Sequence, residues 1–282
     1  MNEFTIKKVI FSIFLVFSNV LLAENEVLDC VIEPSKLIEM SSQVRGVLET
    51  VYVERGDFVK KGQLVAKLMS GVEKASVQLS RDRAKMEVDI KSRKAERQFR
   101  NNNLKQITGL YHKKLASQRE YDDAKTLSVV ADIELEKARE LKHLAVLELR
   151  RTQEVLKLRS MHSVVNGVVV EVMKSPGEFV EEQPVMKIAQ INPLNIEVIV
   201  PEQLMGNIKI GQESNVILDK PTDSSLVAKV SIIDQVIDAS SGTFGVRLTL
   251  ANPGNKIHAG QRCSVVLVDN LHSDEDKNND SK

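Results

Sequence analysis

The chain has 282 residues and carries 39 Lys and Arg residues against 39 Asp and Glu residues, so its formal net charge at pH 7 is zero. This balance excludes the strongly basic composition typical of nucleic-acid-binding proteins, and it gives no overall field toward an anionic surface. Aromatic residues make up 4% of the chain, Trp is absent and 28% of the residues are charged. We expect long solvated helices combined with β modules, rather than an enzyme built around a concave apolar pocket.

The N-terminal residues are typical of a secretory signal peptide. Lys7 and Lys8 precede an apolar run over residues 9–20, and Ala23 offers a small residue at the cleavage position. We predict that residues 1–23 are removed by cleavage after Ala23 and that the mature chain is exported. The apolar run is short for a membrane span, but an uncleaved N-terminal anchor is the alternative interpretation.

An internal repeat connects two distant parts of the chain. When Gly46 is aligned with Gly167 without gaps, Gly56 falls on Gly177, and the same order of strand, tight turn and strand is predicted in both copies. Glycine at the matched turn position supplies the positive φ that such turns often need. Because each copy is too small to close a core, we expect both copies to form one small β-sandwich.

Residues 70–160 separate the two copies and are predicted to form an antiparallel α-helical hairpin. The predicted sandwich is therefore split into residues 27–69 and 161–191. Extended segments over residues 27–42 lead into the first copy, and we expect Pro34 to interrupt them.

Both predicted helices of the hairpin are rich in good helix formers, and neither Pro nor Gly occurs within residues 73–106 or 117–159. A polar break over residues 108–116 is expected to join them, and about 36 residues of helix give a rod of roughly 55 Å. The second helix carries a stripe with heptad spacing, in which Glu134 and Glu148 fill two places. Its other members are Ala124, Leu127, Ala131, Ala138, Leu141, Ala145, Thr152 and Val155.

The first helix is weakly apolar and densely charged. Its thin apolar stripe consists of Ala84, Val88, Ala95 and Phe99. We interpret the charges as the solvated face of a coiled coil, or as a lateral contact with the second helix of a neighbouring copy.

Short predicted strands after the second copy favour a small β-barrel over residues 192–269. These strands are expected over residues 195–200, 214–218, 226–233, 243–250 and 262–268. Residues 27–33 are a candidate further strand of the barrel, and the polar tail over residues 270–282 is predicted to be disordered. The predicted fold class is mainly β, with one long α-helical hairpin inserted in a split β-sandwich.

Two cysteines lie near the two ends of the predicted mature chain. Cys30 is in an extended entry segment and Cys263 is in the last predicted strand. Because the split architecture brings the chain ends together, an oxidising compartment makes these residues candidates for a structural disulfide. Two buried free thiols in a β core are the alternative.

The sequence offers no constellation of residues typical of catalysis or metal binding. Its histidines are scattered without ligand spacing, at His112, His143, His162, His258 and His272. Neither a Gly-rich phosphate loop nor an HExxH motif is present. We predict no catalytic, cofactor-binding or metal site.

The two copies resemble the halves of the biotinyl/lipoyl-type domain. The order of all the parts resembles a periplasmic adaptor, or membrane fusion protein, of tripartite efflux systems. Residues 200–212, 238–248 and 251–261 are similar to adaptors that work with resistance-nodulation-division pumps. The resemblance implies a non-enzymatic periplasmic protein that links an inner-membrane efflux pump to an outer-membrane TolC-type duct. It also implies self-association as a hexameric ring, and no cofactor.

Two other functions stay open. The same fold would suit an adaptor of an ABC exporter or of a type I secretion system, although those adaptors usually keep a transmembrane N-terminal helix and longer hairpins. A lipoyl or biotin carrier module would need a modified Lys on a tight hairpin between the two halves. Here the insertion over residues 70–160 replaces that hairpin.

The predicted hairpin tip resembles the tip of adaptors that dock a TolC-type duct. Those adaptors share an Arg, a Leu four residues on and a Ser seven residues beyond that, followed by a Glu-Tyr-Asp-like run. Leu110, Ser117, Glu120 and Tyr121 match this spacing, whereas Gln106 stands in place of the Arg. The resemblance implies that Leu110, Ser117 and Tyr121 contact a duct and that Glu120 supports the start of the helix.

Ser117 also has an explanation that needs no partner. It is a suitable N-cap for the second helix, and Glu120 lies three residues on, where it can close a capping box. Docking and capping alone are both open interpretations of Ser117.

Overall fold

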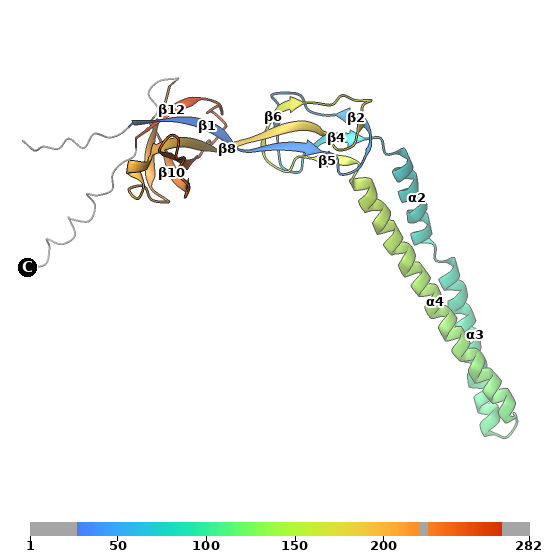
Figure 1. Cartoon of the computed structure of the whole chain (residues 1–282). Helices are drawn as coiled ribbons and strands as arrows, with labels where there is room; N and C mark the ends of the chain where they lie inside the picture. Colours follow the sequence, from blue (N-terminus) through green and yellow to red (C-terminus); the bar gives the residue numbers. More distant parts are fainter. Residues whose placement is uncertain (1–26, 220–224, 267–282) are drawn as a thin grey trace, which may run out of the picture. The chain divides into compact units, whose positions relative to one another are not determined.

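The computed structural model describes residues 27–219 and 225–266, so the predicted signal peptide and the predicted C-terminal tail lie outside the described residues. The chain divides into two compact units, which are Ile38–Ile188 and the described parts of Met1–Leu37 and Ala189–Lys282. Figure 1 labels helices α2, α3 and α4 and several strands of each unit. As predicted, the described residues are mainly strands with one long helical hairpin.

The unit Ile38–Ile188 contains both copies of the sequence repeat, and strands of one copy pair with strands of the other. Its short strands are β2 (Gly46–Val51), β3 (Phe58–Val59), β4 (Leu64–Leu68), β5 (Ser160–His162), β6 (Gly167–Val172) and β7 (Phe179–Val180). β2 pairs with β7, and β3 pairs with β6, both in antiparallel register. Each copy therefore completes the other, because the first strand of each copy is bonded to the second strand of its counterpart.

The turns of the two copies make matching hydrogen bonds. Leu48 donates its backbone N–H to the carbonyl of Glu178 (2.9 Å), and its own carbonyl accepts the N–H of Gly177 (2.8 Å). Val169, which aligns with Leu48, makes the same two bonds to the turn of the first copy. Gly56 and Gly177 have φ angles of 95° and 92°, which confirms the predicted positive φ at the matched turn position.

Matched residues of the two copies also fill one shared core. Its buried side chains include Leu48, Val59 and Val65 from the first copy and Val169, Val180 and Met186 from the second. Full burial of an aliphatic side chain stabilises a fold by roughly 1.5–3 kcal/mol. Because each copy supplies only part of this core, the sandwich depends on both.

The hairpin consists of α2 (Gly71–Lys85), α3 (Val88–His112) and α4 (Gln118–Lys157). The prediction of one continuous first helix is wrong, because Met86 has extended backbone angles (φ −63°, ψ 126°) and separates α2 from α3. Neither Pro nor Gly occurs at this break, so the sequence carries no local signal for it. α2 and α3 each pack on α4, and this tertiary context overrides helix propensity.

The predicted polar break between the two arms begins too early, because α3 continues through Gly109 to His112. A single Gly inside a helix costs only about 1 kcal/mol relative to Ala. The hydroxyl of Thr108 bonds back to the carbonyl of Leu104 (2.7 Å), as it can within an uninterrupted helix. The left-handed residue at the end of α3 is Lys114, with a φ of 59°.

The predicted apolar stripe of α4 is only half right. The residues that α4 buries are Ala124, Ser128, Ala131, Leu135, Ala138 and Thr152. Leu127, Leu141 and Val155, which we predicted in the same stripe, are 42%, 55% and 41% exposed. In the first arm Ala84 is buried, whereas the other members of its predicted stripe are exposed. The hairpin therefore packs through one half of the α4 heptad pattern and leaves the other half uncovered.

The second unit is a closed β-barrel. Its strands are residues 27–37 of β1 (Val27–Ser41), residues 189–201 of β8 (Pro184–Pro201), β9 (Glu213–Leu218), β10 (Ser225–Ile233), β11 (Thr243–Leu250) and β12 (Arg262–Val266). The 3-10 turn η1 (Glu202–Leu204) follows β8. Their order is β1-β12-β9-β10-β11-β8, and β8 also pairs with β1, so the ring closes. Buried residues face one another across β8 and β11, with Val200 opposite Phe244 and Val198 opposite Val246.

The expected interruption at Pro34 is wrong, because β1 runs without a break from Val27 to Ser41. The residues of β1 that pair with β12 are Val27–Val31, so Pro34 lies beyond that ladder. The missing N–H of Pro34 therefore removes no hydrogen bond from the β1–β12 ladder.

Cys30 and Cys263 face each other directly across β1 and β12, and the structure joins them as a disulfide with their Cα atoms 4.9 Å apart. Both side chains are buried in the barrel. The bond would connect residues 233 positions apart in the sequence.

We propose that this disulfide forms in the exported protein and stabilises the barrel. Cys263→Ser is expected to lower the free energy of unfolding by about 2–5 kcal/mol, because the unfolded chain loses a long-range constraint. Denaturant titration measures this loss, and Ser264→Ala on the same strand is the matched control. Alkylation of both cysteines in denaturant without a reducing agent would contradict the proposal.

Candidate functional site

The start of α4 at the hairpin tip has the predicted capping box. Ser117 Oγ accepts the N–H of Glu120 (3.3 Å), and the Glu120 carboxylate accepts the N–H of Ser117 (2.7 Å) and its hydroxyl (2.8 Å). The backbone N–H of Ser117, followed by its hydroxyl, lowers the pKa of the Glu120 carboxyl. Ser117 therefore fixes the beginning of α4, whatever else it contacts.

The end of α3 is closed by a Schellman motif. The N–H of Leu115 bonds to the carbonyl of Leu110 (2.9 Å), and the N–H of Lys114 bonds to the carbonyl of Tyr111 (2.9 Å). Lys114 supplies the left-handed conformation that this motif requires. Leu110 and Leu115 occupy the two positions that the motif usually brings together as an apolar pair.

Two tyrosines connect the arms at the tip. The rings of Tyr111 on α3 and Tyr121 on α4 stack with their centroids 5.1 Å apart and their planes at 18°. The hydroxyl of Tyr111 donates a hydrogen bond to the side-chain oxygen of Gln118. Both helix ends and the aromatic pair therefore hold the tip in one shape before any partner arrives.

The structure brings the predicted residues Leu110, Ser117, Glu120 and Tyr121 together at this tip, with Tyr121 half-buried under its stacking partner and the other three exposed. Leu115 is a tip residue that the sequence analysis missed, and it is 72% exposed. Leu110 is 41% exposed, so two leucines are presented to solvent at the end of the hairpin. The exposure of Leu115 follows from the end of α3 at His112, and the sequence analysis placed the start of the loop too early.

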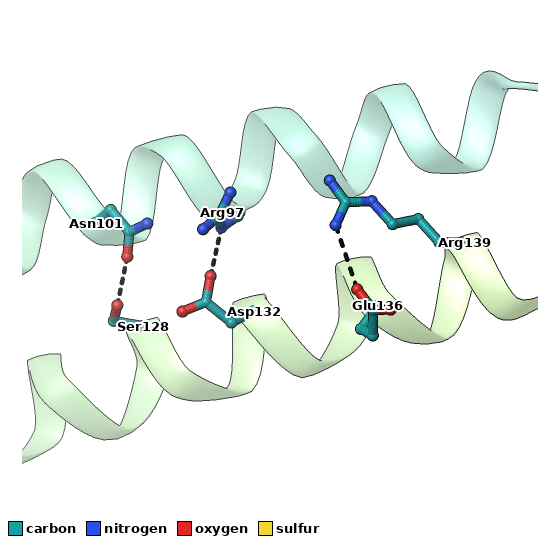
Figure 2. Close-up of polar contacts among 6 residues, drawn as sticks. All are labelled: Arg97, Asn101, Ser128, Asp132, Glu136 and Arg139. Carbon is teal, nitrogen blue, oxygen red and sulfur yellow. Dashed lines mark hydrogen bonds and ion pairs between the residues drawn. The ribbon is translucent and has the colours of Figure 1, made fainter.

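Polar side chains connect the two arms along the hairpin (Figure 2). Arg97 of α3 pairs with Asp132 of α4, and the hydroxyl of Ser128 donates to the side-chain oxygen of Asn101. Some charged side chains of the first arm therefore form ion pairs with α4 within the hairpin. Such exposed pairs contribute little stability individually, so they serve mainly to fix the alignment of the arms.

The root of the hairpin is held by one arginine. Arg159 pairs with Glu73 (2.6 Å), and its guanidinium also donates to the carbonyl of Arg45 (2.9 Å). A Cβ atom on Gly46 would lie 2.5 Å from this guanidinium, so glycine leaves the space that Arg159 occupies. The last residues of the hairpin are thereby attached to the first strand of the sandwich.

Within residues 27–219 and 225–266, no group of three or more His, Cys, Asp or Glu side chains is arranged to hold a metal ion. No helix within these residues is both long enough and apolar enough to cross a membrane.

The barrel and the whole fold resemble known proteins. Residues 194–270 match the family model described as the CusB-like beta-barrel domain. The crystal structure of MacA from Actinobacillus actinomycetemcomitans superposes with a TM-score of 0.72 at 20% sequence identity, covering 86% of this chain and 78% of MacA. The membrane fusion protein Spr0693 from Streptococcus pneumoniae R6 superposes with a TM-score of 0.56 at 16% identity, covering 85% of this chain and 97% of Spr0693.

The chain has the membrane fusion protein fold. The predicted resemblance to this class of adaptors is thereby confirmed. Among curated proteins, the cobalt-zinc-cadmium resistance protein CzcB of Cupriavidus metallidurans is 23% identical over 219 residues, which are 77% of this chain and 40% of CzcB. The chain spans about half the length, or less, of the curated relatives it matches.

The capping box gives a test of how the tip is held in this membrane fusion protein fold. Ser117→Ala is expected to destabilise the protein by about 1 kcal/mol, because the first turn of α4 loses its N-cap, whereas Ser117→Thr keeps it. Thermal unfolding of both variants measures the difference. Equal melting temperatures for wild type and Ser117→Ala would show that the cap does not support the tip.

The same motif predicts that the stability of the protein depends on pH. Because the pKa of Glu120 is lowered on folding, its contribution is present above the unfolded pKa and is lost as the pH falls through the folded pKa. The melting temperatures of wild type and Glu120→Gln are therefore expected to converge on acidification. A constant difference between neutral and strongly acidic pH would contradict this role.

Proposed function

We propose that the chain is a non-enzymatic periplasmic adaptor that links an inner-membrane efflux pump, of the resistance-nodulation-division type, to an outer-membrane TolC-type duct. In this proposal the signal peptide over residues 1–23 is cleaved on export, and the protein associates with the inner membrane through its pump. The adaptor takes part in sealing and coupling an export conduit and assembles as a hexameric ring. The membrane fusion protein fold and the match of residues 194–270 to the CusB-like barrel support this proposal.

The observation that carries the duct assignment is the tip, which combines a fixed backbone with exposed apolar side chains. Exposed Leu110, in the last turn of α3, and exposed Leu115, in the loop, lie where both helix ends are capped. A preformed apolar site loses little conformational entropy on binding, so it suits a docking surface. Ser117 and Tyr121 are proposed to contact the duct beside these leucines, with Glu120 holding the helix start.

Gln106 lies on α3 one helical turn before Leu110 and is exposed, in the place where related tips carry Arg. An amide offers fewer donors than a guanidinium and no charge. We therefore expect the leucines, rather than a charged bond from position 106, to dominate docking in this chain.

The duct assignment is tested by site-specific photocrosslinking in intact cells. A photoreactive residue at Leu115 leaves the capping box intact, and a probe at Val88 is the matched control because it is 78% exposed on the first arm. We expect an adduct with an outer-membrane protein from the Leu115 probe alone. Adducts from both probes, or from neither, would contradict docking through the tip.

A further inference from the structure

Five members of the predicted α4 stripe are not buried in the hairpin. Together with the residues that lie three positions after each of them, they form a second continuous seam. This outer seam follows alternating steps of three and four residues, and Leu158, directly after α4, keeps helical backbone angles. Its members are Leu127, Val130, Glu134, Lys137, Leu141, Leu144, Glu148, Arg151, Val155 and Leu158. The apolar members are each between 38% and 58% exposed, so the unit Ile38–Ile188 leaves a large part of each side chain uncovered.

The order of residues along the outer seam is symmetric about its middle. Two apolar positions at each end and two at the centre enclose two charged layers, one formed by Glu134 and Lys137 and the other by Glu148 and Arg151. When the seam is reversed about the point midway between Lys142 and His143, apolar residues fall on apolar residues. The charged positions fall on positions of the opposite sign.

We propose that the outer seam binds the outer seam of a second copy in antiparallel orientation, as an isologous two-fold dimer of hairpins. In this pair Leu127 faces Leu158 of the second copy, and Val130 faces Val155. Leu141 and Leu144 pack across the two-fold axis. Self-complementary contacts of this kind are what two-fold symmetry requires of one surface that binds itself.

The charged layers select the antiparallel orientation. Reversal sets Glu134 against Arg151 of the second copy and Lys137 against Glu148. A parallel pair in register would set each of these charges against the same residue of the second copy, which is unfavourable. Charge complementarity therefore specifies both the partner, a second copy, and its direction.

The present contacts of these charges leave them free to exchange partners. Arg151 pairs with Glu148 within α4 (2.8 Å), and Glu134 lies 3.8 Å from Arg93 of α3. Exposed ion pairs of this kind contribute little, so exchanging them across an interface costs little. Leu127, Val130 and Glu134 also line a small groove of about 150 Å³, beside Arg93 and Arg100.

In the proposed pair the tip of each hairpin extends beyond the outer seam of the other copy. About nine residues of α4 precede Leu127, and they extend roughly 13 Å beyond the seam. At the opposite end of the seam, Leu158 lines an open groove of about 420 Å³ together with Met161 and His162. In the proposed pair the tip of the other copy projects past this end of the seam.

The antiparallel pair goes beyond the adaptor function and differs from a ring. A two-fold contact closes with two copies and directs their tips in opposite directions, so it describes a resting form that a ring would have to replace. If the antiparallel pair does not form, the proposal of docking through Leu115 is unaffected, because the photocrosslink at Leu115 does not involve the outer seam.

Charge exchange between the two layers tests the proposal on the purified full-length protein. Glu134→Lys with Lys137→Glu sets like charges against each other in the antiparallel pair, and we expect dimerisation in analytical ultracentrifugation to weaken by about tenfold or more. Adding Glu148→Lys and Arg151→Glu restores every pair and is expected to restore the dimer. In a parallel pair the first exchange would change nothing.

The matched control exchanges Glu136 and Arg139, an ion pair of α4 outside the outer seam (3.2 Å, Figure 2), and should leave dimerisation unchanged. Disulfide crosslinking gives the orientation directly. A mixture of Leu127→Cys and Leu158→Cys chains is expected to form mixed dimers, whereas Leu127→Cys alone is not. A wild-type chain that stays monomeric, or efficient crosslinking of Leu127→Cys alone, would overturn the proposal.

Discussion

The reciprocal pairing of the two repeat copies is the constraint on which the rest of the unit Ile38–Ile188 depends. β2 needs β7 and β3 needs β6, so the sandwich cannot close until residues on both sides of the hairpin have met. The same pairing brings the first strand of the sandwich to the end of the hairpin, where Arg159 bonds to Glu73 and to the carbonyl of Arg45. These contacts join residues that are far apart in the sequence. The position of the hairpin root therefore depends on the closed sandwich core.

From that root the hairpin uses its surface unevenly. One half of the α4 heptad pattern packs on the first arm through small residues such as Ala131 and Ala138, which let the helices approach closely. The other half stays unburied along the outer seam, where apolar positions alternate with two charged layers. At the tip, caps and a tyrosine stack stabilise a loop that presents Leu110 and Leu115. The hairpin thus has two separate exposed surfaces with apolar side chains, one at its end and one along its side.

The elements with a strong local signal could be predicted from the sequence. Glycine at Gly56 and Gly177 marked the turns, and Ser117 with Glu120 marked the start of α4, because each feature depends on residues close in the chain. The errors share a different cause. The break at Met86 and the choice of Leu135 over Leu127 for the buried seam are decided by packing between helices, which local propensity and heptad counting do not contain. Leu115 was missed because its exposure follows from where α3 ends.

We propose that this protein holds two membrane proteins together through different parts of its chain. Affinity purification of the tagged protein from detergent-solubilised cell envelopes, followed by quantitative mass spectrometry, tests this claim directly. The account predicts that an inner-membrane transporter and an outer-membrane channel are both enriched, and that Leu115→Asp removes the channel but keeps the transporter. Enrichment of neither protein, or equal recovery of the channel with Leu115→Asp, would contradict it.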